Sequence, residues 1–382
     1  MKTVLPSPAA FLLSLFAAVV AFAVEPDAGF DWNRARELHR RQAAGGTLSA
    51  DEAAYVRNAI ALHQQGVQPG GAPARTGPAP GGKESVGLVP LSDLGTGTYR
   101  GEDGGLYGGG RNEPPAAHAA AAAKELARIR PLDADGKPAA DGRVALLSVG
   151  MSNTTMEFQK FMELAGADPR KSPRLAIVDG AQGGQAAAQW AAAPDNRVWQ
   201  TVDQRLQAAG VTPPQVQVAW IKQANIRPTE PFPEHAKKLQ ADLATIVRLL
   251  KKTFPNLRVA YLSSRIYAGY ATTALNPEPY SYEGAFAVRG LIRDQIKGEP
   301  GLNYDPARGE VAAPLLLWGP YLWADGTKGR KIDGLVWTRD DLVPTDGTHP
   351  SPAGRQKVAE LLLRFFTTDP GAQTWFLAPP AK

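Results

Sequence analysis

The sequence has 382 residues, of which 43% are apolar and 21% charged, and its formal net charge is +5. This is the composition of a globular chain long enough for one large domain and a small one. The net charge is small and no basic stripe is interleaved with aromatic residues, which excludes a nucleic-acid partner of the usual kind. The sequence contains no cysteine, which excludes disulfides, thiolate metal sites and cysteine nucleophiles.

Residues 1–23 have the pattern of a secretory signal peptide. Lys2 supplies the positive start, an apolar run extends from Phe11 to Val20, and Ala21-Phe22-Ala23 matches a small-residue cleavage site. The run is short for a hydrocarbon core of about 30 Å, which favours a cleaved signal over a membrane anchor. We therefore expect export, to the periplasm or beyond, of a mature chain that has no integral membrane segment.

The mature chain is predicted to begin with a small helical hairpin over residues 24–66. Ser49 and Glu52 have the spacing of a capping box, and an apolar stripe follows at Tyr55, Val56, Ile60 and Leu62. A Gly/Pro-rich linker is predicted over residues 67–87. We expect the hairpin to serve packing or spacing, with anchoring to the cell envelope as the alternative.

Residues 88–372 are predicted to form an α/β domain. The segment 94–112 is dense in Gly and Tyr and is expected to be an ordered surface loop, with a substrate-lining loop as the alternative. An Ala-rich helix is predicted over residues 118–130. Apolar runs at 144–149, 175–178, 216–221, 257–263 and 315–318 predict strands, and helices are predicted at 155–164, 184–190, 233–254, 283–296 and 352–366.

Near-continuous apolar strands that alternate with helices indicate a parallel sheet covered on both faces. Ligands of such sheets bind beyond the carboxyl ends of the strands, so candidate site residues are sought there. Ser152 follows the first strand, where a helix N-terminus would stabilise an oxyanion; an ordinary N-cap is the alternative. Gly183 and Gly184 follow the second strand, and Asn225 follows the third. The glycines can point N–H groups at a ligand or can simply make a turn.

The C-terminal segment Asp346-Gly347-Thr348-His349-Pro350-Ser351 carries the strongest pattern in the sequence. Ser351 is a good N-cap for the last helix, and Pro352 fits its first position. Asp346 can accept the Nδ1 proton of His349, which leaves Nε2 free to take a proton from a serine hydroxyl. None of the five histidines has a metal-ligand spacing, so we predict no metal site and no cofactor.

Residues 143 to 367 resemble the SGNH (GDSL-type) hydrolases in the order and spacing of four motifs. The resemblance implies a flavodoxin-like three-layer fold and a serine hydrolase site with no cofactor. By it, the nucleophile is Ser152, the oxyanion donors are Gly184 (or Gly183) and Asn225, and the base and its partner are His349 and Asp346.

Two motifs depart from the family pattern. Met151 stands where the usual G-D-S motif has its Asp, and Gln223-Ala224-Asn225-Ile226 keeps only the Asn of G-x-N-D. Roughly 120 residues separate Asn225 from His349, and their Tyr- and Trp-rich pieces are interpreted as a rim over the active site. A position in the core is the alternative for Trp318 and Trp323, and it is favoured for Trp318, which ends a strand. The leading hypothesis is an exported serine esterase acting on a small-molecule or polysaccharide ester, with an acylated carbohydrate as a candidate. The alternative is a non-catalytic carbohydrate- or ligand-binding protein on the same fold.

Overall fold

The computed structural model describes residues 34–35, 37–38, 41, 46–64, 82–193 and 196–379, with side chains of 60–64 left out. The chain divides into two compact units, Met1–Pro78 and Ala79–Lys382. The predicted signal peptide lies outside the described residues. Among the helices that the structure does describe, none is long and apolar enough to cross a membrane.

The first unit contains helix α2 (Ala50–Gln64). The Ser49 N–H donates to Glu52 Oε2 at 2.9 Å, and the Glu52 N–H donates to Ser49 Oγ at 3.2 Å. These two bonds confirm the capping box, which satisfies two of the N–H groups left free at the helix start. The first arm of the predicted hairpin lies mostly outside the described residues, so the hairpin stays a prediction.

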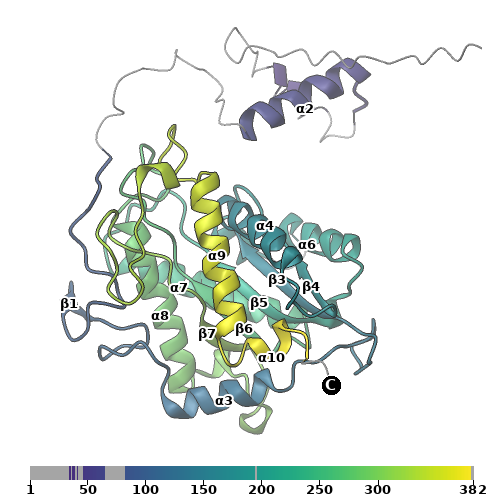
Figure 1. Ribbon diagram of the computed structural model, residues 1–382, viewed down its shortest axis with the longest axis vertical. Helices are drawn as coiled ribbons and strands as arrows, with labels where there is room; N and C mark the ends of the chain where they lie inside the picture. The colour runs from purple at the N-terminus through teal and green to yellow at the C-terminus, as the bar shows by residue number, and fades with distance from the viewer. Residues whose placement is uncertain are drawn as a thin grey trace, which may run out of the picture. The chain divides into compact units, whose positions relative to one another are not determined.

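The second unit is built on a five-stranded parallel sheet of order β4-β3-β5-β6-β7 (Figure 1). Its strands are β3 (Val144–Gly150), β4 (Leu175–Val178), β5 (Val216–Lys222), β6 (Val259–Ser263) and β7 (Leu315–Trp318). Counted along the chain this is the order 2-1-3-4-5, which is the flavodoxin-like order. The fold class implied by the sequence resemblance is therefore confirmed for this unit.

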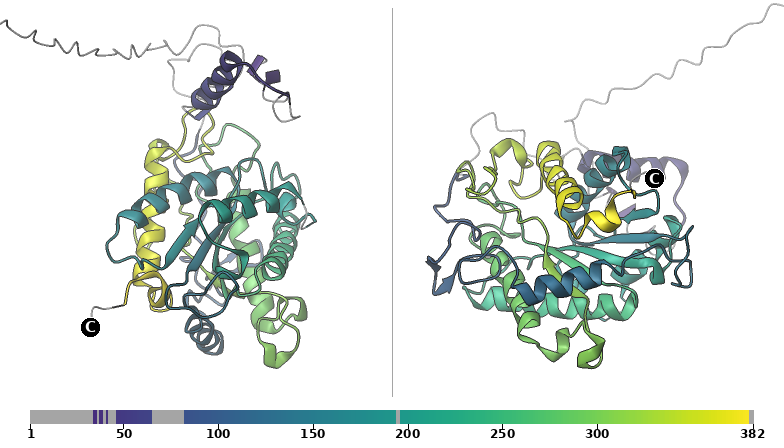
Figure 2. Two further views of the ribbon diagram at one scale, coloured as in Figure 1. Left: turned by 90° about the vertical axis from the view of Figure 1, so that its right-hand side faces the viewer. Right: turned by 60° about the horizontal axis from the view of Figure 1, so that its bottom comes forward.

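Helices cover both faces of the sheet (Figure 2). Helices α4 (Ser152–Ala167), α9 (Pro352–Thr368) and α10 (Gln373–Phe376) lie on one face, and α3 (Ala116–Leu126), α7 (Glu234–Thr253) and α8 (Tyr280–Lys297) lie on the other. All residues of β3, β5, β6 and β7 are buried. This two-sided burial explains why the strands are continuous apolar runs instead of alternating ones.

Several elements differ from the sequence prediction. The connection from β4 to β5 contains α5 (Ala187–Trp190) and also α6 (Arg197–Ala208), which was not predicted. The Gly/Tyr-rich segment contains a short hairpin of β1 (Thr98–Tyr99) and β2 (Glu102–Asp103), paired antiparallel. The segment is therefore more regular than the surface loop that its composition suggested.

The interpretation of the Tyr- and Trp-rich pieces as a rim over the site is wrong. Of the seven Tyr and Trp side chains in these pieces, Tyr280 is half-buried. The other six are between 0 and 6% exposed: Tyr267, Tyr270, Tyr282, Trp318, Tyr321 and Trp323. The Tyr282 and Trp323 rings, for example, pack with their centroids 4.7 Å apart. The long connections around β6 and β7 thus bury these rings in the core, because large aromatic surfaces gain more from burial than from exposure to water.

Candidate active site

The loops that carry the predicted site residues meet at the carboxyl edge of the sheet. β3 lies between β4 and β5, and Gly150 at the end of β3 is in register with Lys222 at the end of β5. The connections from these strands leave in opposite directions, which makes this edge a topological switch point. Met151 precedes Ser152, Ala186 lies two residues after Gly184, and Ala224 precedes Asn225; these three residues form a small buried apolar cluster. The three loops are therefore packed against one another.

Ser152 is the first residue of α4. Met151 occupies the N-cap position without a side-chain cap bond, so the alternative interpretation of Ser152 as an ordinary N-cap is wrong. The first intrahelical bond runs from Thr155 N to Met151 O at 3.0 Å, and the N–H groups of residues 152–154 have no partner inside the helix. The serine oxygen thus lies at the positive end of the helix dipole.

Gly150 makes the sharp turn into α4 possible. A Cβ at this position would come within 2.5 Å of the Lys222 carbonyl oxygen on the neighbouring strand end. The Thr154 hydroxyl donates to the same carbonyl at 2.7 Å. Because only glycine fits this close approach, the strand can end directly against β5 and present Ser152 at the edge.

His349 connects Ser152 to Asp346. Ser152 Oγ lies 2.8 Å from His349 Nε2, and His349 Nδ1 lies 2.6 Å from Asp346 Oδ2. The carboxylate also accepts the N–H groups of Thr348 at 2.8 Å and His349 at 3.0 Å through Oδ1. With Nδ1 donating to the carboxylate, Nε2 is the nitrogen that can accept the serine proton.

The pKa of Asp346 follows from these contacts. Burial alone would raise it, but the hydrogen bonds from the His349 ring and from the two backbone N–H groups outweigh burial and lower the pKa. Asp346 is therefore a stable anion at neutral pH. An anion at this place holds the imidazole in one orientation and stabilises the imidazolium that forms when Nε2 takes a proton.

Two residues that the sequence analysis did not single out hold the His349 loop. Asn153 Nδ2 donates to the Thr348 carbonyl at 2.9 Å, and Arg265 Nη2 donates to it at 3.3 Å. Arg265 is only 2% exposed, and burial lowers its pKa. Asn153 follows Ser152 directly, and Arg265 follows β6. Both lie just beyond the carboxyl end of a predicted strand, and this position is the sequence signal that could have identified them.

Gly183 and Gly184 have different geometry. A Cβ added to Gly183 would lie 4.0 Å from the Ser152 Cβ, whereas one added to Gly184 would meet nothing within 4 Å. Gly184 has a φ of +75°, which is the left-handed region that favours glycine. The structure thus places Gly183 beside Ser152 and makes Gly184 the residue on which the turn depends.

Asp179 fixes the start of that glycine turn, a role that sequence analysis missed. Its Oδ1 accepts the Ser148 hydroxyl at 2.6 Å, its Oδ2 accepts the Thr155 hydroxyl, and Ser148 Oγ accepts the Gly180 N–H at 3.1 Å. Burial raises the pKa of Asp179 although these hydroxyl donors act to lower it. The carboxylate links β3, α4 and the loop after β4, so it sets the distance between that loop and Ser152.

Asn225 is 7% exposed and lies three residues after the end of β5. Its side-chain Nδ2 donates to the His235 carbonyl at 2.8 Å, and its backbone carbonyl accepts from Asn276 Nδ2 at 3.0 Å. Within the described residues, no hydrogen bond joins Asn225 to Ser152 or His349. A carboxamide carries two N–H donors, so one of them remains for a ligand at the switch point.

A buried ion pair lies on the inner side of α4. Lys222 Nζ contacts Glu157 Oε2, and the side chains are 1% and 0% exposed. Burial lowers the pKa of Lys222 to about 8 and raises that of Glu157, because both charged forms lose hydration. The pair joins the helix that begins with Ser152 to the strand that precedes Asn225.

The arrangement suits acyl transfer through a serine nucleophile. A hydroxyl, a proton acceptor and an orienting carboxylate form a continuous chain, with helix N–H groups beside the hydroxyl. No cluster of three or more His, Asp or Glu side chains that could hold a metal ion occurs in the described part of the chain.

Comparison with known proteins finds similarity among solved structures. No protein-family model and no curated protein sequence matches the chain. A Bacteroides fragilis protein described as a candidate acylhydrolase is 14% identical, covering 66% of this chain and 96% of its own, with a TM-score of 0.34. A lipase from a goat rumen metagenome is 11% identical (58% and 96% covered, TM-score 0.32). The periplasmic domain of a lipopolysaccharide acetyltransferase from Salmonella ser. Paratyphi A is 12% identical (59% and 84% covered, TM-score 0.32).

Proposed function

We propose that this chain is a serine ester hydrolase that acts through an acyl-enzyme, with Ser152 as nucleophile and His349 as general base. The observation that carries the proposal is the hydrogen-bonded chain from Asp346 through His349 to Ser152, with steps of 2.6 and 2.8 Å. Each member has the partner that its role requires, and the nucleophile stands at a helix N-terminus.

The reaction takes place in two steps. Ser152 Oγ attacks the acyl carbonyl while His349 Nε2 takes the hydroxyl proton, and the resulting imidazolium gives that proton to the departing alcohol oxygen. An acyl-Ser152 ester remains. A water molecule then attacks this ester, with Nε2 again taking and returning one proton, so that the carboxylic acid leaves and Ser152 is restored.

Three groups are proposed to stabilise the oxyanion of each tetrahedral intermediate. They are the Ser152 N–H, an N–H of the turn at Gly183 and Gly184, and the second Nδ2 hydrogen of Asn225. The support for them is that the loops carrying them share one buried cluster at the carboxyl edge of β3, β4 and β5, and that Gly183 lies beside Ser152. Removal of one such donor typically costs about 3 kcal/mol of transition-state stabilisation.

We further propose that the chain is exported and that its substrate is an acylated carbohydrate. Export is supported by the signal-like pattern of residues 1–23. The carbohydrate part rests on export alone, because the rings that suggested stacking on sugar faces are buried. A panel of acetylated polysaccharides, short lipid esters and aryl esters tests this part: turnover confined to the lipid or aryl esters would contradict it.

A fluorophosphonate label tests the catalytic proposal. The wild type should be labelled covalently, and Ser152→Ala should abolish the label. Ser264→Ala is the matched control, since Ser264 is a buried serine just beyond β6, which β5 separates from β3, and should not affect labelling. A folded wild type that takes no label would contradict the proposal.

The second candidate function is ligand binding without catalysis. Two observations favour it: Met151 replaces the acidic residue of the usual first motif, and Asn225 forms no hydrogen bond with Ser152 in the described structure. Under this function an acetylated oligosaccharide would raise the melting temperature of the wild type and of Ser152→Ala equally. Covalent labelling of Ser152 would exclude it.

A further inference from the structure

A second histidine–carboxylate pair, this one buried, lies beside Asn225 and away from the Ser152–His349 contact. His235 Nε2 is 2.5 Å from Glu283 Oε2, and each side chain is 1% exposed. A buried pair of this kind contributes little net stability, because the loss of hydration offsets much of the attraction. It does impose one geometry on the two helices that carry it.

The pair is joined to Asn225 through the backbone of α7. His235 is the second residue of that helix, and its carbonyl accepts the Asn225 Nδ2 hydrogen at 2.8 Å. The Tyr280 ring packs edge-on to the imidazole with centroids 4.9 Å apart. With the imidazole held on one side by Glu283 and on another by Tyr280, the first turn of α7 is fixed, and so is the carbonyl that orients the Asn225 amide.

Residues of the β1–β2 hairpin contact the second carboxylate oxygen of Glu283. Glu283 Oε1 accepts the Tyr99 hydroxyl at 2.5 Å, and the Arg100 guanidinium lies 3.5 Å from the same oxygen. Burial, and then the neighbouring Glu283 carboxylate, raise the pKa of Tyr99, so its hydroxyl stays protonated and donates. Both carboxylate oxygens of Glu283 therefore have partners.

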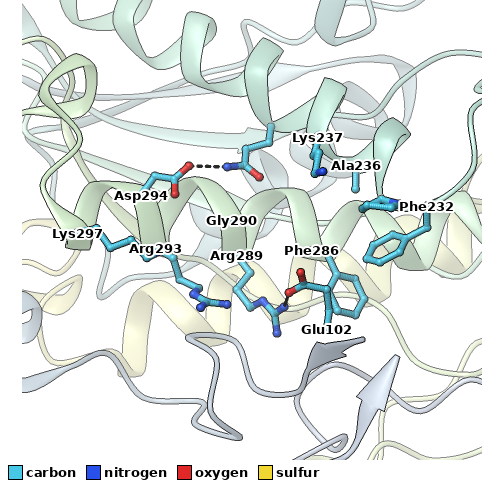
Figure 3. Close-up of a pocket in the computed structure, with 12 residues that line it drawn as sticks. Glu102, Phe232, Ala236, Lys237, Phe286, Arg289, Gly290, Arg293, Asp294 and Lys297 are labelled. Carbon is cyan, nitrogen blue, oxygen red and sulfur yellow. Dashed lines mark hydrogen bonds and ion pairs between the residues drawn. The ribbon is translucent and has the colours of Figure 1, made fainter. Parts of the chain in front are cut away.

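The hairpin is itself attached to α8. Arg289 Nη2 donates to Glu102 at 2.7 Å, and Arg289 Nη1 lies 3.1 Å from Asp103 Oδ1. Figure 3 shows the Glu102–Arg289 contact at the edge of a pocket of about 250 Å³ between α7 and α8. The Tyr99 ring stacks on Phe286, which also lines this pocket, with centroids 5.6 Å apart. None of the five proposed site residues lines the pocket.

We propose that Tyr99, Glu283 and His235 form a positioning assembly for the Asn225 amide. The Tyr99 hydroxyl of the hairpin binds the Glu283 carboxylate, and this carboxylate in turn binds the His235 ring. The His235 carbonyl accepts one Asn225 Nδ2 hydrogen, so that the other Nδ2 hydrogen faces the oxyanion. The three side chains are positioning residues, because their hydrogen bonds go to one another and none joins them to Ser152 or His349. The inference rests on the proposed esterase function and adds to it a hairpin more than 120 residues upstream of Asn225.

Two variants loosen the assembly without creating a cavity. Glu283→Gln keeps the shape but weakens both bonds at once, and kcat should fall about tenfold with KM unchanged, since small misplacement of a catalytic donor has effects of this order. Tyr99→Phe keeps the stacked ring and removes only the hydroxyl, and kcat should fall about threefold. It serves as the second test if Glu283→Gln folds poorly.

Glu125→Gln is the matched control: Glu125 is a buried, ion-paired carboxylate on α3, beside Arg258 at the opposite edge of the sheet.

A double-mutant cycle with Asn225→Ala separates positioning from general structural damage. If the assembly acts through Asn225, Glu283→Gln and Tyr99→Phe lower kcat in the wild type and leave kcat of Asn225→Ala unchanged. Equal fold-losses in both backgrounds, or losses matched by Glu125→Gln, would overturn the proposal. Active-site titration with the fluorophosphonate corrects each kcat for the folded, reactive fraction.

A readout without turnover keeps this inference distinct from the proposed function. The Asn225 side-chain amide resonance, identified in ¹⁵N-asparagine-labelled protein by its loss in Asn225→Ala, reports the geometry directly. If the wild type neither reacts nor turns over, the esterase proposal fails, and this resonance decides the assembly. A shifted resonance in Glu283→Gln but not in Glu125→Gln supports the assembly, and an unshifted one overturns it.

Discussion

The two sides of the site are held in different ways. On one side, His349 reaches Ser152 directly and is oriented by Asp346, three residues earlier in the chain. On the other, Asn225 is oriented through a carbonyl on α7, whose helix start is fixed by a carboxylate on α8. The base is thus positioned by local contacts and the oxyanion donor by tertiary ones, so the two sides should respond differently to substitution.

The largest effect is expected on the locally held side. Asp346→Asn removes the anion that fixes the His349 tautomer, and kcat should fall by roughly 10³–10⁴-fold with little change in stability. Steady-state kinetics on an aryl acetate gives the value. Asp340→Asn, a substitution of an exposed carboxylate six residues before Asp346, is the control and should leave kcat unchanged. A loss below tenfold in Asp346→Asn would show that the carboxylate does not orient the base.

The tertiary side should show a smaller loss. Asn225→Ala removes one proposed oxyanion donor and should lower kcat by roughly 10²–10³-fold on the same substrate. Asn256→Ala is the control, since Asn256 bonds the Pro214 carbonyl at 2.9 Å before β6, away from the site. Unchanged turnover in Asn225→Ala would show that Asn225 is not part of the oxyanion hole, and only the Asp346–His349 side of the site would then contribute to catalysis.

The glycine turn offers a third, smaller test. Gly184→Ala places a side chain at φ +75°, and the free energy of unfolding should fall by about 1 kcal/mol. Gly183→Ala has no such backbone cost, and its Cβ would make ordinary contact with Ser152. Urea unfolding measures both. If Gly183→Ala is the more destabilising, the assignment of the turn to Gly184 is wrong.

Glu278, which lies outside both sides of the site, is expected to make the stability of the fold depend on pH. Burial raises the pKa of its carboxyl to about 7, although N–H donors from Trp323, Ala268 and Tyr282 act to lower it. Because the folded state holds this proton more tightly than the unfolded state, stability present below about pH 4.5 should be lost as the pH rises towards 7. Urea unfolding of Glu278→Gln across this range should lack that slope; a slope equal to the wild type would contradict the assignment.

The fold could be predicted from sequence because its strands are buried on both faces. The runs at 175–178 and 315–318 coincide with β4 and β7, and the other strands agree to within two residues. The start of α9 was predicted from its cap: Ser351 is the N-cap and accepts the Gly354 N–H at 3.3 Å. A side-chain cap alone was not sufficient, because α6 is capped by Asn196 and was not predicted. The start of α4 was predicted three residues late, because its N-cap, Met151, carries no capping side chain.

The site was predictable to the extent that it is local. Asp346 and His349 fall within one turn of chain, and their spacing already implies the contact that the structure contains. The partners of Asn225 could not be found this way. His235 and Glu283 are 48 residues apart on two helices, and Tyr99 is a further 184 residues from Glu283, so only the packed sheet and helices bring them together.

The buried aromatic residues show a second limit of sequence reasoning. Tyr and Trp near a predicted site suggest a ligand surface, yet Trp323 and Tyr267 are fully buried. Composition gives the number of aromatic rings but not whether the connections that carry them place these rings in the core or at the surface. Long connections can enclose a core of their own, which has room for large side chains. The substrate therefore has to be identified by experiment on the proposed acyl-enzyme.

Trapping of the acyl-enzyme tests the central claim most directly. The protein is mixed with an aryl acetate, quenched in acid within the first turnover, and digested for peptide mass spectrometry. The account predicts one acetyl group on the peptide containing Ser152, increased in yield when deacylation is slowed and absent in Ser152→Ala. Turnover with no acetyl group on Ser152, or with the group on another residue, would contradict it.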